Sequence, residues 1–148
     1  MPYPALQNFD SPTGDISCPR RNRSNTPLQA LTTLNEELFV DCARALAAKI
    51  VTDGGESDSD RVNYAVRRCL AREPNSAELT TLKNFLHHQR RRFTDGSADP
   101  WPLISDDKPP HESGESVKLP ANAQPAELAA WTALARVVLN LDETITKE

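Results

Sequence analysis

The sequence predicts an all-α fold, in which an irregular N-terminal arm packs on a bundle of four to five helices and a long Pro-rich acidic loop precedes the last helix. Three observations support this prediction. Apolar residues recur at helical spacing in several separate stretches. Two of these stretches begin with a capping box, in which two side chains satisfy free backbone groups of the first helical turn. No stretch shows convincing strand periodicity.

The composition fits one domain of ordinary size or part of a larger one. The chain has 148 residues, 17 Lys and Arg against 21 Asp and Glu, and two Trp, two Tyr and four Phe, which suffice for one modest core. No stretch approaches the about 20 apolar residues of a membrane span, and residues 1–10 lack the pattern of a secretory signal. We therefore expect residues 1–148 to form a single, partial helical domain without a membrane span, whose location the chain itself does not reveal.

The first segment, residues 1–25, reads as an irregular arm. Four prolines and Gly14 leave no room for a long regular element. Phe9 and Ile16 are the expected buried anchors of the arm.

Residues 26–93 are expected to form the helical core, and its first helix has a well-marked start. Thr26 caps the helix, Pro27 suits its first position and Gln29 completes a capping box. Asn35 offers a second cap, so we expect a short helix, a kink near Asn35 and a longer helix to about Val51. The apolar residues expected on these two helices are Leu28, Leu31 and Leu34, then Leu38, Phe39, Cys42, Ala43, Leu46 and Ile50, with Glu37, Asp41 and Arg44 facing away.

Two further helices are expected at about residues 59–71 and 76–93. Asn75 and Glu78 form a capping box for the second of them. The apolar faces are Val62, Ala65, Val66, Cys69 and Leu70 on the first, with Arg67 and Arg68 opposite, and Leu79, Leu82, Phe85, Leu86 and Phe93 on the second.

Residues 94–124 differ in kind from the rest. They hold five Pro, two Gly and six acidic residues against two Lys, with almost no apolar periodicity. Composition of this kind favours a disordered insert, with a functional lid as the alternative. Trp101, Leu103 and Ile104 are exceptions that can pin its first part to the surface.

Residues 125–148 are expected to form the C-terminal core helix and tail. The helix begins at Pro125, runs to about Asn140 and carries the strongest apolar face in the chain. This face consists of Leu128, Trp131, Leu134, Ala135, Val138, Leu139 and Leu141.

Candidate nucleophiles and metal ligands give weak signals. The chain has no Cys-x-x-Cys motif. Cys42 and Cys69 lie on apolar faces and are expected to pack as small hydrophobes, while Cys18 has no visible general base beside it. His87 and His88 point about 100° apart on a helix and lack helical neighbours that bind metals, so we expect no metal site.

The stronger candidate site is the arginine loop, which we define as Arg20, Arg21, Arg23 and Asn25. It precedes a helix N-terminus, where guanidinium groups and free backbone amides favour an anion or an interface. The alternative is that these arginines bond loop carbonyls and the acidic insert. The run from Arg90 to Arg92 is expected to be a solvated face that complements the helix dipole.

Paired carboxylates for acid–base chemistry have few candidates. Asp142 and Glu143 near the C-terminus and Asp10 and Asp15 in the arm are the plausible ones, and nothing in the sequence brings them together. Arg136 and Asn140 lie one turn apart on the polar side of the last helix, where they can face the arm.

Two stretches resemble a known family. They are Phe9-Asp10-x-Pro12 followed by CPRRNRSNTPLQAL at residues 18–31 and Leu34-Asn35, and ELAAWTALARVVLNLDE at residues 127–143. Both resemble the C-terminal part of the planctomycete domain of unknown function numbered 1553. The resemblance covers residues 9–93 and 126–148, with departures at Glu36-Glu37, where the family often has Asp-Pro, and at Thr144, where it usually has an aromatic residue.

The resemblance implies a parent architecture rather than a reaction. The family domain typically closes large extracytoplasmic proteins that carry a cytochrome-c-like domain and another uncharacterised domain upstream. It implies a periplasmic or cell-surface location, and any haem in the parent belongs to an upstream domain, so no cofactor is expected in this chain.

These observations favour a non-catalytic helical module that docks against upstream domains of its parent or another surface protein. The alternative is a contribution of the Arg20–Arg23 loop to a composite hydrolase-type site or to an anionic polysaccharide surface. Nucleic-acid binding is disfavoured, because no recognised motif is present and the pI is near 5.4.

Overall fold

The structure, a computed structural model, describes residues 7–12, 17–20, 24, 26–105, 119–120 and 123–145. This part of the chain contains helices and no strand, which confirms the predicted all-α class. The helices are α2 (Pro27–Asn35), α3 (Glu37–Asp53), α4 (Asp58–Leu70), α5 (Ser76–Thr94), α6 (Trp101–Ile104), α8 (Pro125–Leu139) and α9 (Asp142–Ile145).

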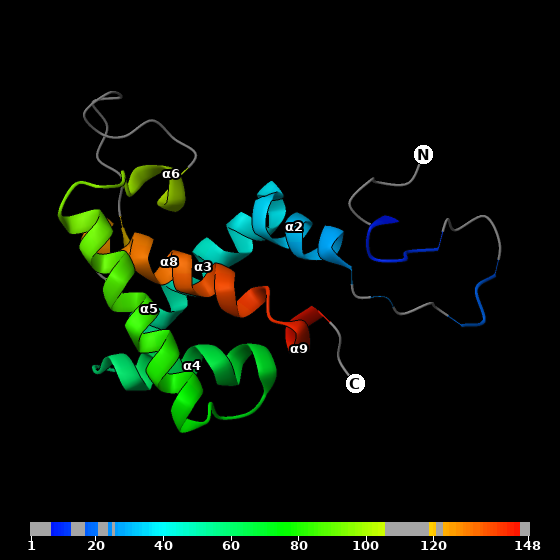
Figure 1. Ribbon diagram of the computed structural model, residues 1–148, viewed down its shortest axis with the longest axis horizontal. Coiled ribbons are helices and arrows are strands. Elements are labelled where there is room, and N and C mark those ends of the chain that lie inside the picture. Colours follow the sequence, from blue (N-terminus) through cyan, green and yellow to red (C-terminus); the bar gives the residue numbers. More distant parts are fainter. Residues whose placement is uncertain are drawn as a thin grey trace.

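Helix α8 is the centre of the bundle. It packs against α3 and α5 most extensively and also against α4, α6 and α2, and Figure 1 shows it between α5 and α3. Eight of its 15 residues are buried, so it is apolar around most of its circumference rather than along one stripe. The sequence predicted both its bounds, to within a residue, and its role as the strongest apolar element.

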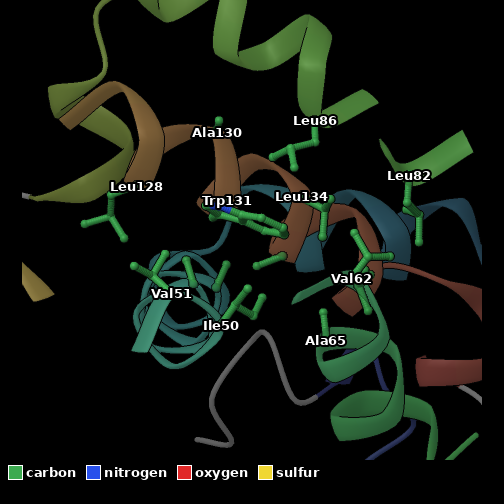
Figure 2. Packing of buried hydrophobic residues seen from close by; sticks show 14 of the residues in the cluster. Ile50, Val51, Val62, Ala65, Leu82, Leu86, Leu128, Ala130, Trp131 and Leu134 are labelled. Atoms are coloured by element: carbon green, nitrogen blue, oxygen red, sulfur yellow. The ribbon is translucent and has the colours of Figure 1, made fainter. Parts of the chain in front are cut away.

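Trp131 of α8 is the largest fully buried side chain and lies in the middle of the hydrophobic core. Figure 2 shows it beside Leu134, with Ile50 and Val51 of α3 on one side and Leu86 of α5 on the other. The other buried apolar residues come from four helices: Ala43 and Ala47 on α3, Val62, Ala65 and Val66 on α4, Leu82 and Phe93 on α5, and Leu128, Ala129, Ala130, Ala135 and Val138 on α8.

The predicted helix starts are mostly confirmed. The Thr26–Gln29 and Asn75–Glu78 capping boxes are both present at the starts of α2 and α5. The second cap predicted at Asn35 is wrong. Asn35 is the last residue of α2 and its side chain donates to Leu31 O at 2.9 Å, so the chain bends one residue later, at Glu36, which caps α3 without a side-chain hydrogen bond.

The predicted apolar stripe of α3 is rotated in the structure. Leu38 and Cys42 are exposed, whereas Ala43 and Ala47 are completely buried against the core. Small side chains on this face let α3 and α8 approach closely, which a stripe of leucines would prevent. The prediction that Cys42 packs as a buried thiol is therefore wrong, while Cys69 is half-buried against the core, and burial raises the pKa of its thiol.

The start of the predicted insert is ordered by packing. Ala98, Leu103 and Ile104 pack against the core, and α6 lies over α8 and α3. Arg44 of α3, predicted to face away, turns toward α6 and donates to Leu103 O and Pro102 O at 3.1 and 3.0 Å. The expectation of disorder for residues 106–118 falls outside the described residues.

No helix in the described ranges is both long and apolar enough to cross a membrane.

Candidate functional site

The arginine loop predicted from the sequence lies mostly outside the described residues. Arg20 is exposed, and the Cys18 thiol donates to its backbone carbonyl at 3.3 Å. Arg21, Arg23 and Asn25 are not among the described residues. The role of these four residues as an anion or interface site therefore stays a prediction.

The arm meets α2 through a polar junction, which we define as Asn8, Ser24, Gln29 and Thr32. Asn8 lies before the arginine loop in the sequence and Ser24 lies within it. The Gln29 amide is 1 % exposed and donates to Asn8 O at 2.7 Å and to Ser24 Oγ at 2.9 Å. Asn8 Nδ2 donates to Thr32 Oγ1 at 3.0 Å. Because buried amides need partners, this network fixes the arm against α2.

Two more contacts of the arm strengthen the junction. Ser24 Oγ donates to the Asp10 carboxylate. Phe9 packs on Phe39 of α3, with ring centroids 5.8 Å apart and planes inclined at 45°. Phe9 is half-buried, consistent with its predicted role as an anchor, while Ile16 lies outside the described residues.

The side of α2 that faces α8 is also polar. Thr33 is 5 % exposed and its hydroxyl donates to Asn140 Oδ1, while Arg136 donates through Nη2 to Leu34 O. The sequence placed Arg136 and Asn140 toward the arm. Both instead bond to α2, which lies between the arm and α8.

The outer side of α2 is apolar. Leu28 and Leu31 are 54 % and 57 % exposed and, three residues apart on a helix, share one face. We call this pair the leucine face. Leu38, at the start of α3, is 59 % exposed. The apolar spacing that predicted the buried side of α2 thus marks its solvent side, and the buried residues of α2 are Gln29 and Thr33.

A second polar cluster, which we call the charge clamp, consists of Asp58, Arg90 and Glu127. Arg90 donates through Nη1 and Nη2 to both oxygens of Asp58, at 2.6 and 2.7 Å, and through Nε and Nη2 to both oxygens of Glu127, at 2.7 and 2.6 Å. It therefore joins α4, α5 and α8 with one guanidinium. The prediction that Arg90 to Arg92 form a solvated face is therefore wrong for Arg90, while Arg91 and Arg92 are exposed.

Trp131 completes the charge clamp from the core side. Its Nε1 donates to Glu127 Oε1 at 2.7 Å, and the Arg90 guanidinium carbon lies 5.8 Å from the centre of its ring. These contacts tie the largest core residue to the ion pairs by a hydrogen bond and a cation–π contact.

The pKa values of the clamp indicate a structural role. The hydrogen bonds from Arg90 hold the pKa of Asp58 below its usual value. Burial acts to raise the pKa of Glu127, but the hydrogen bonds from Arg90 and Trp131 outweigh it and hold that pKa below its usual value as well. Both carboxylates are ionised at neutral pH and bonded, so neither is poised as a general acid.

Arg72, in the loop between α4 and α5, forms a more exposed cluster. It donates to both oxygens of Glu78 at 2.9 and 2.8 Å and to Glu143 Oε2 at 2.9 Å. The hydrogen bond from Arg72 lowers the pKa of Glu78 to about 2. Glu143 lies on α9 and is one of the acids considered for catalysis. It thus pairs with Arg72 from the loop between α4 and α5.

The arrangement of the described residues also bears on catalysis and metal binding. The described residues contain no group of three or more His, Cys, Asp and Glu that could hold a metal ion. His87 and His88 are exposed on α5. The described geometry thus shows an exposed apolar face on α2 and two clusters of ion pairs.

Comparison with known proteins gave one match. The family described as "PSD1: Protein of unknown function (DUF1553)" matches residues 1–86, which include the arm, α2, α3, α4 and the first part of α5. No curated protein and no solved structure matches the chain. The matched region contains the CPRRNRSNTPLQAL stretch and ends before the charge clamp is completed by Arg90 and Glu127.

Proposed function

The chain belongs to the DUF1553 family of proteins of unknown function, and from that premise we propose that it is a non-catalytic helical module that docks through the leucine face of α2. The observation that carries this proposal is the reversed polarity of α2. Its inner side is held by the buried side chains of Gln29 and Thr33, and its outer side presents Leu28 and Leu31.

This reversal has an energetic meaning. Leucines that are more than half exposed bring little hydrophobic stabilisation to the chain that carries them, whereas full burial of a leucine side chain is worth about 1.5–3 kcal/mol. The polar junction holds the helix in place without using the leucines. Both can therefore be buried by a partner with little rearrangement of α2.

The partner that we propose is an upstream domain of the same parent protein, which presents an apolar stripe to the leucine face. The family resemblance supports this choice, because it implies a cytochrome-c-like domain and another uncharacterised domain upstream. The charges at the two ends of α2 indicate how the partner's stripe is oriented. The exposed Arg20 precedes α2 in the sequence and Glu36 and Glu37 follow its end, so the complementary stripe carries acidic residues at one end and basic residues at the other.

The same resemblance leads us to propose a periplasmic or cell-surface location, with any haem held by the upstream domain. Arg20, Arg21, Arg23 and Asn25 would organise the interface from the arm. The alternative function uses the same four residues as an anionic polysaccharide surface or as part of a composite hydrolase-type site. It is favoured by the exposed Arg20, which precedes α2 in the sequence.

The test is a calorimetric titration of the 148-residue chain with an upstream domain produced from a parent gene of the family. We expect binding that Leu28→Glu with Leu31→Glu abolishes. The matched control is Asn84→Glu, which adds a charge at an exposed position on α5 and should leave binding unchanged. Binding that survives the double substitution would remove α2 from the interface.

The alternative function, binding of an anionic glycan, can be tested on the same 148-residue chain by thermal unfolding. A rise in melting temperature with heparin, lost in Arg20→Ala with Arg23→Ala and retained in the leucine variant, would favour an anionic glycan as the ligand. Self-association through the leucine face would appear as a dimer in light scattering without any added domain.

A further inference from the structure

A cleft of about 450 Å³ lies between α5, α6, α8 and the end of α2. Its volume falls in the range of small-molecule sites, about 300–1,000 Å³. One face of α5 forms a wall with Phe85, Gln89 and Phe93, and Ala133 and Val137 of α8 line the opposite side. The cleft therefore has a mixed lining, whose apolar part comes largely from α5 and α8.

Two guanidinium groups, from Arg92 and Arg136, also line the cleft. Arg92 donates through Nη1 to the buried Gln89 amide oxygen at 3.1 Å. Arg136 is half-buried and donates through Nη2 to Leu34 O. No carboxylate of the described residues forms an ion pair with either group. Arg92 nevertheless interacts electrostatically with the Asp95 carboxylate at the end of α5.

Arg136 has the less satisfied surroundings of the two. Its Nε is the one buried side-chain nitrogen or oxygen among the described residues that has no hydrogen-bond partner. A buried donor of this kind costs free energy until an acceptor reaches it, and more so when the group is charged. This observation points to an anionic acceptor that is missing from the described part of the chain.

Among the described residues, Asp99 is the one carboxylate that lines the cleft, and it already accepts a hydrogen bond. Its Oδ1 accepts a hydrogen bond from Trp101 N at 3.1 Å, at the start of α6. The lining residues therefore carry a net positive formal charge, because they contain two arginines, Arg92 and Arg136, and one carboxylate, Asp99.

We propose that this cleft binds a small carboxylate with an apolar body, in which the carboxylate pairs with Arg136, assisted by Arg92, and the body lies against Phe85 and Phe93. Aromatic walls suit an aromatic or short aliphatic body, and guanidinium groups suit a carboxylate. The site goes beyond the proposed docking function and depends on different residues.

The test uses 4-phenylbutanoate as the probe and its amide, 4-phenylbutanamide, as the matched neutral compound, in an NMR titration of the isotope-labelled 148-residue chain. We expect the carboxylate to shift the amide signals of Phe93 and Ala133 at lower concentration than the amide compound does. An equal response to both compounds would show that charge has no role and would overturn the proposal.

Variants separate the cleft from general charge effects. Arg136→Gln should weaken binding by about tenfold, the loss expected for a charge-assisted hydrogen bond, and Arg92→Gln by a smaller factor. Arg91→Gln is the matched control, because Arg91 is exposed on the same helix and does not line the cleft. It should leave the affinity unchanged, and an equal loss in Arg91→Gln would contradict the site.

A last variant keeps the test decisive if Arg136→Gln perturbs the fold. Ala133→Leu fills the cleft and leaves both guanidinium groups in place. It should abolish binding while circular dichroism remains that of the unchanged chain. Binding that persists in Ala133→Leu would place the carboxylate elsewhere.

Discussion

The two sides of α8 differ in which kind of side chain is buried and which kind is exposed. Toward α4 and α5, apolar side chains are buried around Trp131, and the charges at the edge are paired within the charge clamp. Toward α2, polar side chains such as Gln29 are buried and leucines face outward. In the first region the apolar side chains are covered by the chain itself, whereas the second leaves apolar side chains exposed. The following predictions test this difference, from the largest expected effect to the smallest.

The largest effect is expected at the centre of the complete region. Trp131→Ala should lower the free energy of unfolding by about 3–5 kcal/mol, because it removes a fully buried ring and leaves a cavity. It also removes the hydrogen bond to Glu127. Urea denaturation followed by circular dichroism measures the change, and a loss below about 1 kcal/mol would contradict the central position of Trp131.

The next effect concerns the charge clamp. Arg90→Gln should cost about 2–3 kcal/mol at neutral pH, below the 3–5 kcal/mol of a fully buried pair, because the three side chains are partly exposed. Arg91→Gln, one residue along and exposed, is the control and should change stability by less than about 0.5 kcal/mol. Chemical denaturation of both variants measures the difference.

The pH dependence gives the clamp a second test. Asp58 and Glu127 have folded-state pKa values below the values they have in the unfolded chain, so their contribution is present above the unfolded pKa and is lost as pH falls through the folded pKa. The stability gap between the unchanged chain and Arg90→Gln should therefore narrow from neutral pH to about pH 3. A gap that stays constant over this range would show that Arg90 acts through packing alone.

A smaller effect is expected where a polar residue is buried. Gln29→Leu should destabilise the chain by about 1–3 kcal/mol although it adds an apolar residue, because it leaves Asn8 O and Ser24 Oγ without their donor. Thermal unfolding provides the measurement. A more stable Gln29→Leu chain would mean that the polar junction does not hold α2.

The smallest effect is expected at the leucine face. Leu28→Ser with Leu31→Ser should change the stability of the isolated chain by less than about 1 kcal/mol, because both side chains are more than half exposed. The same pair should lose binding to the upstream domain. A loss of several kcal/mol in the isolated chain would show that these leucines belong to its core.

The sequence was sufficient for the features that depend on local pattern. The capping boxes at Thr26 and Asn75, the bounds of α8 and the burial of Trp131 all follow from spacing and residue type, and the structure confirms them. The family, too, was apparent from short motifs around residues 18–31, which lie within the matched region.

The remaining features depend on contacts between distant residues. Helical spacing identifies apolar residues such as Leu28, Leu31 and Leu38 but does not tell whether the same chain or a partner covers them, and all three are more than half exposed. Arg90 was assigned to a solvated run because its partners, Asp58 and Glu127, lie 32 and 37 residues away in sequence. A lone arginine within a basic run carries no local sign of such pairing.

The most direct test of the docking account is hydrogen exchange of the 148-residue chain alone and with the upstream domain. The account predicts that exchange slows at the amides of Leu28 to Asn35 in α2, while the amides of the buried helix α8 keep the rates of the free chain. Protection confined to other helices, with α2 exchanging as in the free chain, would contradict the docking role of the leucine face.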